Sequence, residues 1–140
     1  MPLLRNYDIF ISHAWRYNET YYRLLNLLNS ALYFQYRNYS APAHDPLANP
    51  DNPITQIHLS TLIDKQIRPV QCVLVIAGMY AAHRYWIDKE IAFAQSYGKP
   101  IVGLVPWGQE RISLSVQYAA HEMVGWNTDS IVNAIRRWAL

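Results

Sequence analysis

The chain has 140 residues, of which 51% are hydrophobic and 16% charged, and its formal net charge is +2. This composition indicates a globular domain with a sizeable core and excludes a disordered chain. The mild charge, with no basic cluster larger than Arg136-Arg137, argues against nucleic-acid binding. We therefore expect one domain, residues 1–140, with no nucleic-acid partner.

Cysteine content and the N-terminal residues indicate the compartment. Cys72 is the only cysteine and lies in an apolar run, so no disulfide forms within the chain, which favours a reducing environment. The sequence enters a predicted strand by residue 7 without a signal peptide, and no apolar run is long enough to cross a membrane. We expect a cytoplasmic protein that does not bind membranes.

Predicted strands and helices alternate along the chain. From β-branched and aromatic runs, strands are expected over residues 7–12, 32–39, 71–77, 100–105 and 123–126. Helices are expected over 19–32, 54–67, 85–97 and 112–120, followed by a last helix that polar residues 127–130 cap. The positions expected to face the core are Tyr22, Leu25, Leu28 and Leu32 in the first helix and Ile131, Ile135 and Trp138 in the last.

This alternation predicts an α/β fold, a flavodoxin-like five-stranded parallel sheet of order 2-1-3-4-5 with helices on both faces. Ligands of such sheets bind beyond the carboxyl ends of the strands, where the strand order reverses. Residues 12–17, the proline-rich residues 40–53 and residues 78–90 are expected to meet at this edge. A ligand site is therefore predicted there.

The predicted third helix carries one carboxylate, Glu90, on its apolar side. At 3.6 residues per turn, Trp86, Ile87, Glu90, Ile91, Ala94 and Tyr97 share that side. Glu90 could form a structural ion pair with Arg84 or interact with the helix dipole. Alternatively, it is a carboxylate in a partly desolvated pocket, aimed at a ligand. The helical pattern alone leaves both open.

Other candidate residues lie in the loops at the same edge. His13 ends the first strand and either contacts a ligand or caps the loop. Ser12 before it is also a candidate for substrate binding, as a turn residue rather than a nucleophile, because no G-x-S-x-G motif surrounds it. Asp45 could orient a ribose, but an Asp-Pro turn explains it too. The histidine spacings do not match a metal site, so none is expected, and no G-x-G-x-x-G motif indicates a redox dinucleotide.

Several of these segments resemble the Toll/interleukin-1 receptor (TIR) domain family. The run Tyr7-Asp-Ile-Phe-Ile-Ser-His13 is similar to the first-strand motif, and residues 40–53 fall where that family has its long BB loop. Trp86-Ile-Asp-Lys-Glu90 resembles the third-helix motif of enzymatic TIR domains. With Arg84, this segment is similar to that of the short TIR-like proteins of bacterial anti-phage systems, notably the Thoeris type.

The resemblance implies an NAD⁺ nucleosidase or ADP-ribosyl cyclase in which Glu90 is essential for cleaving the nicotinamide–ribose bond. NAD⁺ would be the substrate, and no cofactor is expected. Because nicotinamide leaves as a neutral group, one carboxylate can suffice where ordinary glycosidases need two. Residues expected to stack on a ring of the substrate are Trp15, Tyr80 or Trp86, and those expected to bind its pyrophosphate are Arg16 or Arg84.

The resemblance also implies partners. It favours a cyclic ADP-ribose-type signal sensed by a downstream effector, and assembly of the domain through self-association or a trigger. The rival interpretation is a non-enzymatic TIR-like adaptor that associates through residues 40–53 and its aromatic surface. A receiver domain shares the topology but needs an aspartate after the third strand, where Ala77-Gly-Met-Tyr80 stands.

Overall fold

The computed structural model describes residues 5–12, 19–39, 61, 63–77, 84–106 and 114–139. Its strands are β1 (Asn6–Ser12), β2 (Gln35–Asn38), β3 (Cys72–Ile76), β4 (Ile101–Val105) and β5 (Glu122–Gly125). Its helices are α1 (Glu19–Asn29), α3 (Arg84–Ser96), α4 (Leu114–Ala119) and α5 (Thr128–Trp138). Residue 61 and residues 63–67 are also helical, and none of the described helices is long and apolar enough to span a membrane.

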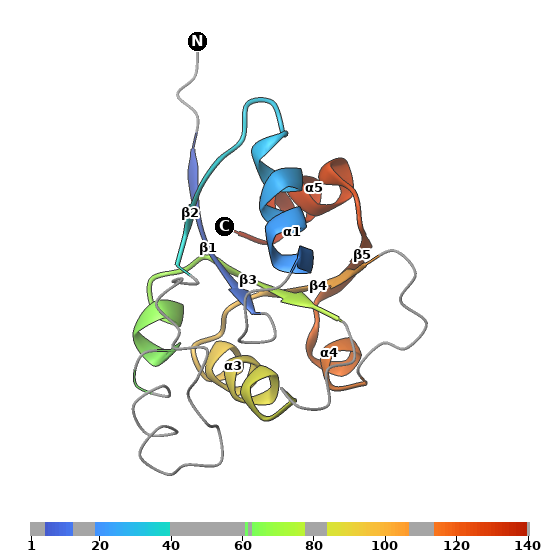
Figure 1. Cartoon of the computed structure of the whole chain (residues 1–140). Coiled ribbons are helices and arrows are strands. Elements are labelled where there is room, and N and C mark those ends of the chain that lie inside the picture. The colour runs from blue at the N-terminus through green and yellow to red at the C-terminus, as the bar shows by residue number, and fades with distance from the viewer. Residues whose placement is uncertain are drawn as a thin grey trace.

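The strands form one parallel sheet of order β2-β1-β3-β4-β5 (Figure 1). The predicted fold class and strand order are therefore confirmed. In the register of the sheet, Ser12 pairs with Val75, so β1 and β3 end side by side at the carboxyl edge. The strand order reverses between these two strands, which makes this edge the expected ligand-binding region.

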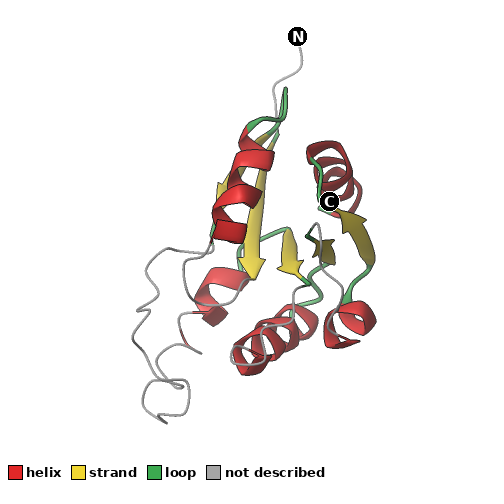
Figure 2. Ribbon diagram, turned by 45° about the vertical axis from the view of Figure 1, so that its right-hand side comes forward, coloured by secondary structure: helices red, strands yellow, loops and turns green. Residues whose placement is uncertain are grey.

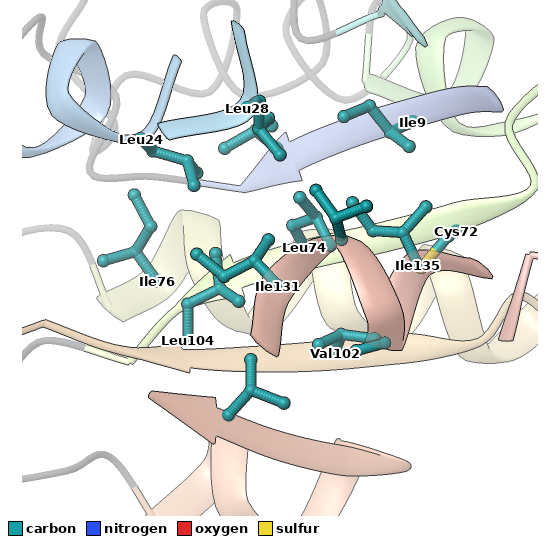
Figure 3. Packing of buried hydrophobic residues seen from close by; sticks show 14 of the residues in the cluster. Ile9, Leu24, Leu28, Cys72, Leu74, Ile76, Val102, Leu104, Ile131 and Ile135 are labelled. Atoms are coloured by element: carbon teal, nitrogen blue, oxygen red, sulfur yellow. The ribbon is translucent and has the colours of Figure 1, made fainter. Parts of the chain in front are cut away.

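Helices cover both faces of the sheet and bury a separate apolar layer on each (Figure 2). Alternate residues of β3 point to opposite layers, and all five are buried because the strand is central. Helices α1 and α5 pack on the face that carries Ile9, Leu74 and Leu104 (Figure 3). Residues 63–67, α3 and α4 pack on the other face, against Phe10 and Val75.

The connection between α1 and β2 differs from the sequence prediction. α1 ends at Asn29 instead of continuing to residue 32, and β2 begins only at Gln35. Tyr33 lies in the turn with φ of 58°, a left-handed conformation that neither helix nor strand contains. The predicted core face of α1 is also wrong in part. Leu28 is buried and Leu25 partly buried, but Tyr22 and Leu32 are exposed, and the buried residues include Tyr21 and Leu24.

The C-terminal helix follows the prediction closely. Asn127 caps α5, because its Oδ1 accepts a hydrogen bond of 2.9 Å from the backbone N–H of Ser130. Ile131 and Ile135 are fully buried, and Trp138 packs partly buried against the same core. The helix is tied to α1 where the Thr128 hydroxyl donates to the carbonyl of Leu27 at 2.8 Å. These contacts make α5 an integral cover of the sheet.

Candidate active site

Helix α3 begins after β3 and runs back along the sheet from its carboxyl edge. Its buried residues are Ile87, Glu90, Ile91 and Ala94, which confirms the predicted stripe over the helix body. The spacing of three and four residues holds them on one side, so Glu90 faces the same layer as the apolar residues. The sequence therefore placed the carboxylate on the correct face of the helix.

Glu90 is only 4% exposed, and Gln66 is the other polar residue in the described core. A carboxylate in such a place loses most of its hydration, so it requires polar or charged partners. Glu90 does have an interaction partner within the protein. The surrounding layer includes Val75, Ile87 and Ile91. The result is a buried carboxylate with a partner inside the protein, two turns into a helix that starts at the carboxyl edge of the sheet.

The remaining predicted site residues are placed only in part. Ser12 is the last residue of β1, and Arg84 and Trp86 lie in the first turn of α3, four residues or more before Glu90. The predictions for these three concern side chains, which lie outside what the structure describes. His13, Trp15, Arg16, Asp45 and Tyr80 lie outside the described residues altogether. Their proposed contacts with a ligand stay predictions.

Tyr97 is the exception to the predicted stripe, because it lies beyond the end of α3 and is 37% exposed. Its hydroxyl donates to Asp64 Oδ1 and accepts a hydrogen bond of 2.9 Å from Arg68 Nε. Arg68 Nη2 also pairs with Asp64 Oδ2 at 2.9 Å. These contacts raise the pKa of the Arg68 guanidinium, chiefly through the Tyr97 hydrogen bond. The cluster ties the preceding helical segment to the C-terminal end of α3.

Sequence analysis missed Gln66, whose side chain is 7% exposed. Its Oε1 atom has no hydrogen-bond partner among the described residues. The signal was present, because Ile63, Gln66, Ile67 and Val70 follow the spacing of a buried helical face. Gln66, like Glu90, is a polar residue at a position that this pattern predicts to be buried.

Other features of the described residues do not add to this site. They contain no group of three or more histidine, cysteine, aspartate or glutamate residues that could hold a metal ion. Two surface hollows formed by described residues border α5, on the opposite face of the sheet from α3. Among the described residues, Glu90 is the buried carboxylate.

The fold defines the class of protein, a parallel α/β domain with the sheet order β2-β1-β3-β4-β5. The family model for "Thoeris protein ThsB, TIR-like domain" matches residues 10–111, which is more than half of the chain. The chain therefore belongs to this family, which takes part in Thoeris anti-phage defence. The predicted family is confirmed.

Comparison with solved structures supports the fold. A conserved protein from Enterococcus faecalis V583 has a TM-score of 0.59 and 10% sequence identity, covering 95% of this chain and 99% of that chain. The CMP N-glycosidase BcmB from Clostridium botulinum has a TM-score of 0.49 and 12% identity, covering 94% and 98%. At these identities the first likeness shows the fold alone, and the second carries no argument. No curated protein matches the sequence.

Proposed function

We propose that this domain cleaves the nicotinamide–ribose bond of NAD⁺, with Glu90 as the catalytic carboxylate. The observation that carries the proposal is the burial of Glu90 to 4% exposure on the sheet-facing side of α3. Glu90 is also the residue that matches the essential glutamate of enzymatic TIR domains. Membership of the Thoeris TIR-like family supports the same assignment.

The chemistry suits a single carboxylate. When the bond between the ribose C1′ and the nicotinamide nitrogen breaks, its electron pair passes to the ring, which leaves as neutral nicotinamide. Positive charge then develops on the ribose, and a carboxylate in an apolar environment stabilises that charge more strongly than one in water. Glu90 would hold the ribose hydroxyls and stabilise the oxocarbenium-like transition state, and no general acid is needed.

The fate of the ribose decides the product. Attack of water on C1′ gives ADP-ribose and a proton, whereas attack by another nucleophilic atom of the same molecule gives a cyclic ADP-ribose isomer. A site that excludes water favours cyclisation. We propose the cyclic product as the signal to a downstream effector, with Arg84 and Arg16 as candidates for binding pyrophosphate and Trp15, Tyr80 and Trp86 as candidates for ring stacking.

The test compares wild type with Glu90→Gln, which keeps the side-chain shape and removes the charge. NAD⁺ is added to each protein, both purified and in lysates of phage-infected bacteria, and nicotinamide and the nucleotide products are followed by chromatography. We expect the wild type to release nicotinamide and Glu90→Gln to lose about 10²-fold or more of that rate, because the transition-state charge is no longer stabilised. If the wild type releases none in either setting, the proposal is wrong.

Asp88→Asn is the matched control, since Asp88 is a half-buried carboxylate on the same helix but outside the buried stripe. We expect it to retain activity within a few-fold. Glu90→Gln also distinguishes an enzyme from a non-enzymatic adaptor. An adaptor that associates through residues 40–53 would keep its defence function in Glu90→Gln and lose it when Pro42 or Pro46 is replaced.

A further inference from the structure

Backbone hydrogen bonds fix the C-terminal end of α3. Gly98 has φ of 66°, and the N–H of Lys99 donates to the carbonyl of Ala94 at 2.8 Å, the long-range bond of a Schellman motif. Just before this turn, Tyr97 keeps the helical pattern, because its N–H donates to the carbonyl of Phe93 at 3.1 Å. Tyr97 is therefore attached to α3 as a helical residue, and its side chain turns together with the helix.

The side chain of Tyr97 binds the helical segment that precedes β3. Its hydroxyl donates to Asp64 Oδ1 and accepts a hydrogen bond of 2.9 Å from Arg68 Nε. Arg68 Nη2 lies 2.9 Å from Asp64 Oδ2, and the guanidinium carbon lies 5.5 Å from the centre of the Tyr97 ring. Asp64 and Arg68 are four residues apart, so they face α3 from one side of their segment. The three side chains form a closed set of directional contacts between the two segments.

Apolar packing also joins these two segments, but it defines the rotation of α3 less sharply. Ile63 and Ile67 share a buried layer with Ile87 and Ile91. The hydrophobic effect is non-directional, so a small rotation of α3 about its axis preserves most of this burial. Hydrogen bonds weaken steeply when their angles change. The hydrogen bonds of Tyr97 therefore fix the rotation of the helix more narrowly than its apolar contacts do.

Glu90 lies on the same side of α3 as Tyr97. The two are seven residues apart, close to two full turns, so their side chains leave the helix in nearly the same direction, about 10.5 Å apart along its axis. A rotation that drew the Tyr97 hydroxyl away from Asp64 would turn Glu90 through the same angle. Because Glu90 is 4% exposed, its neighbours are protein atoms, and such a rotation changes its contacts.

We propose that Tyr97 is a positioning residue for Glu90, acting through the rotation of α3 that its contacts with Asp64 and Arg68 fix. Tyr97 lies at the end of α3 that leads into the amino end of β4, so it is remote from the ligand-binding edge and does not touch substrate. Catalytic groups must be held within about 0.5 Å of their working position. A displacement of about 1 Å, even one caused far from the reacting atoms, costs about 10²-fold in rate.

The inference deepens the proposed function and rests on it for the catalytic consequence, so the first test follows Glu90 without using activity. Glutamate labelled with ¹³C at the side-chain carboxyl is incorporated into the whole chain, and Glu90→Gln identifies the Glu90 signal in NMR spectra. Tyr97→Phe keeps the ring and removes the hydroxyl, and we expect it to shift the Glu90 signal. The control is Tyr118→Phe, the same change at a tyrosine that is 85% exposed on α4, which should leave that signal in place.

The second test measures nicotinamide release at a series of NAD⁺ concentrations. We expect Tyr97→Phe to lower kcat by about three- to tenfold and to leave KM within about twofold, because the carboxylate acts chiefly in the transition state. Asp64→Asn keeps an acceptor for the hydroxyl and should retain more of kcat than Asp64→Ala. Tyr97→Phe combined with Asp64→Ala should lose no more than the worse single variant, since both changes remove the same hydrogen bond.

Urea unfolding verifies that each variant is folded under the conditions of both tests. A merely structural role would lower the stability of Tyr97→Phe and leave the Glu90 signal and kcat unchanged, a result that would overturn the proposal. A signal that moves equally in Tyr118→Phe, or one that moves while kcat stays the same, would also overturn it. If the wild type releases no nicotinamide, the proposed function is wrong, and the NMR comparison still decides whether Tyr97 holds Glu90 in place.

Discussion

Glu90 carries a cost to stability that a neutral residue would avoid. At 4% exposure its carboxylate has lost most of its water, and polar partners in a protein interior repay such a loss only in part. Proteins retain groups of this kind where function requires them, at the expense of stability. The free energy of unfolding of Glu90→Gln therefore distinguishes a functional role of this carboxylate from a structural ion pair, independently of activity.

We expect Glu90→Gln to change the free energy of unfolding by less than about 1 kcal/mol or to raise it, because the neutral amide is cheaper to bury. Urea unfolding followed by circular dichroism measures this, with Glu122→Gln as a control for loss of a more exposed carboxylate. A loss of about 3–5 kcal/mol would instead identify Glu90 as half of a structural ion pair, the value typical of breaking one.

The sequence predicted the placement of Glu90 because helical periodicity is a local property of the chain. Tyr97 was placed on the same side, but its hydroxyl contacts Asp64 and Arg68 from another segment, and periodicity contains no information about such contacts. The loop residues Trp15 and Tyr80 were chosen by residue type and topology, so their contacts with substrate stay predictions.

At the scale of the elements, helix and strand types were predicted well and their junctions less so. Helix α1 was extended to Leu32 because leucine spacing continues past its true end, Asn29. What ends it is the turn around Tyr33, held in part by Arg136 of α5. A contact between residues 103 positions apart cannot be read from local pattern. By contrast, Gly98 ends α3 with φ of 66°, as glycine after an apolar stripe predicts.

Gly103 shows how closely β4 and its neighbours are packed. A Cβ atom added there would lie 2.2 Å from the sulfur of Met123 and 3.3 Å from Val116. We expect Gly103→Ala to lower the free energy of unfolding by about 1 kcal/mol, the low end of the cost of overpacking, because the methionine atoms that it meets are the end of a flexible side chain. Urea unfolding measures this.

The double variant Gly103→Ala/Met123→Ala provides the control. It should lose less stability than the sum of the two single variants, because the clash is gone once the methionine is shortened. Additive losses would show that the methionine side chain moves aside without cost.

At the scale of the whole molecule, the topology followed from the alternation of strands and helices, since parallel sheets and right-handed crossovers leave few alternatives.

The reactivity of the single cysteine measures how the folded domain opens. Cys72 lies in the central strand β3 and is fully buried, and burial raises the pKa of its thiol to about 12.

We expect Cys72 to react with a thiol reagent at pH 8 only as fast as the whole domain unfolds, since the folded protein holds it as a shielded, neutral thiol. The raised pKa means that the folded state keeps a proton that the unfolded chain releases. Its stabilising contribution is thus present below about pH 8 and lost as the pH rises toward 12. Labelling rates at a series of urea concentrations and pH values measure both the unfolding of the domain and this dependence of its stability on pH. Cys72→Ala should remove the pH-dependent contribution. Fast labelling without denaturant would show that β3 opens locally.

The partnership of α1 with α5 has a consequence for synthesis on the ribosome. The first helix is covered by the last one, through bonds such as Thr128 to Leu27 and Arg136 to Tyr33 that span about three quarters of the chain. Until α5 emerges, the apolar layer that holds Ile9, Leu24 and Leu74 lacks part of its cover. This layer is therefore completed only after the last helix has been synthesised, so its apolar residues stay partly uncovered in the growing chain.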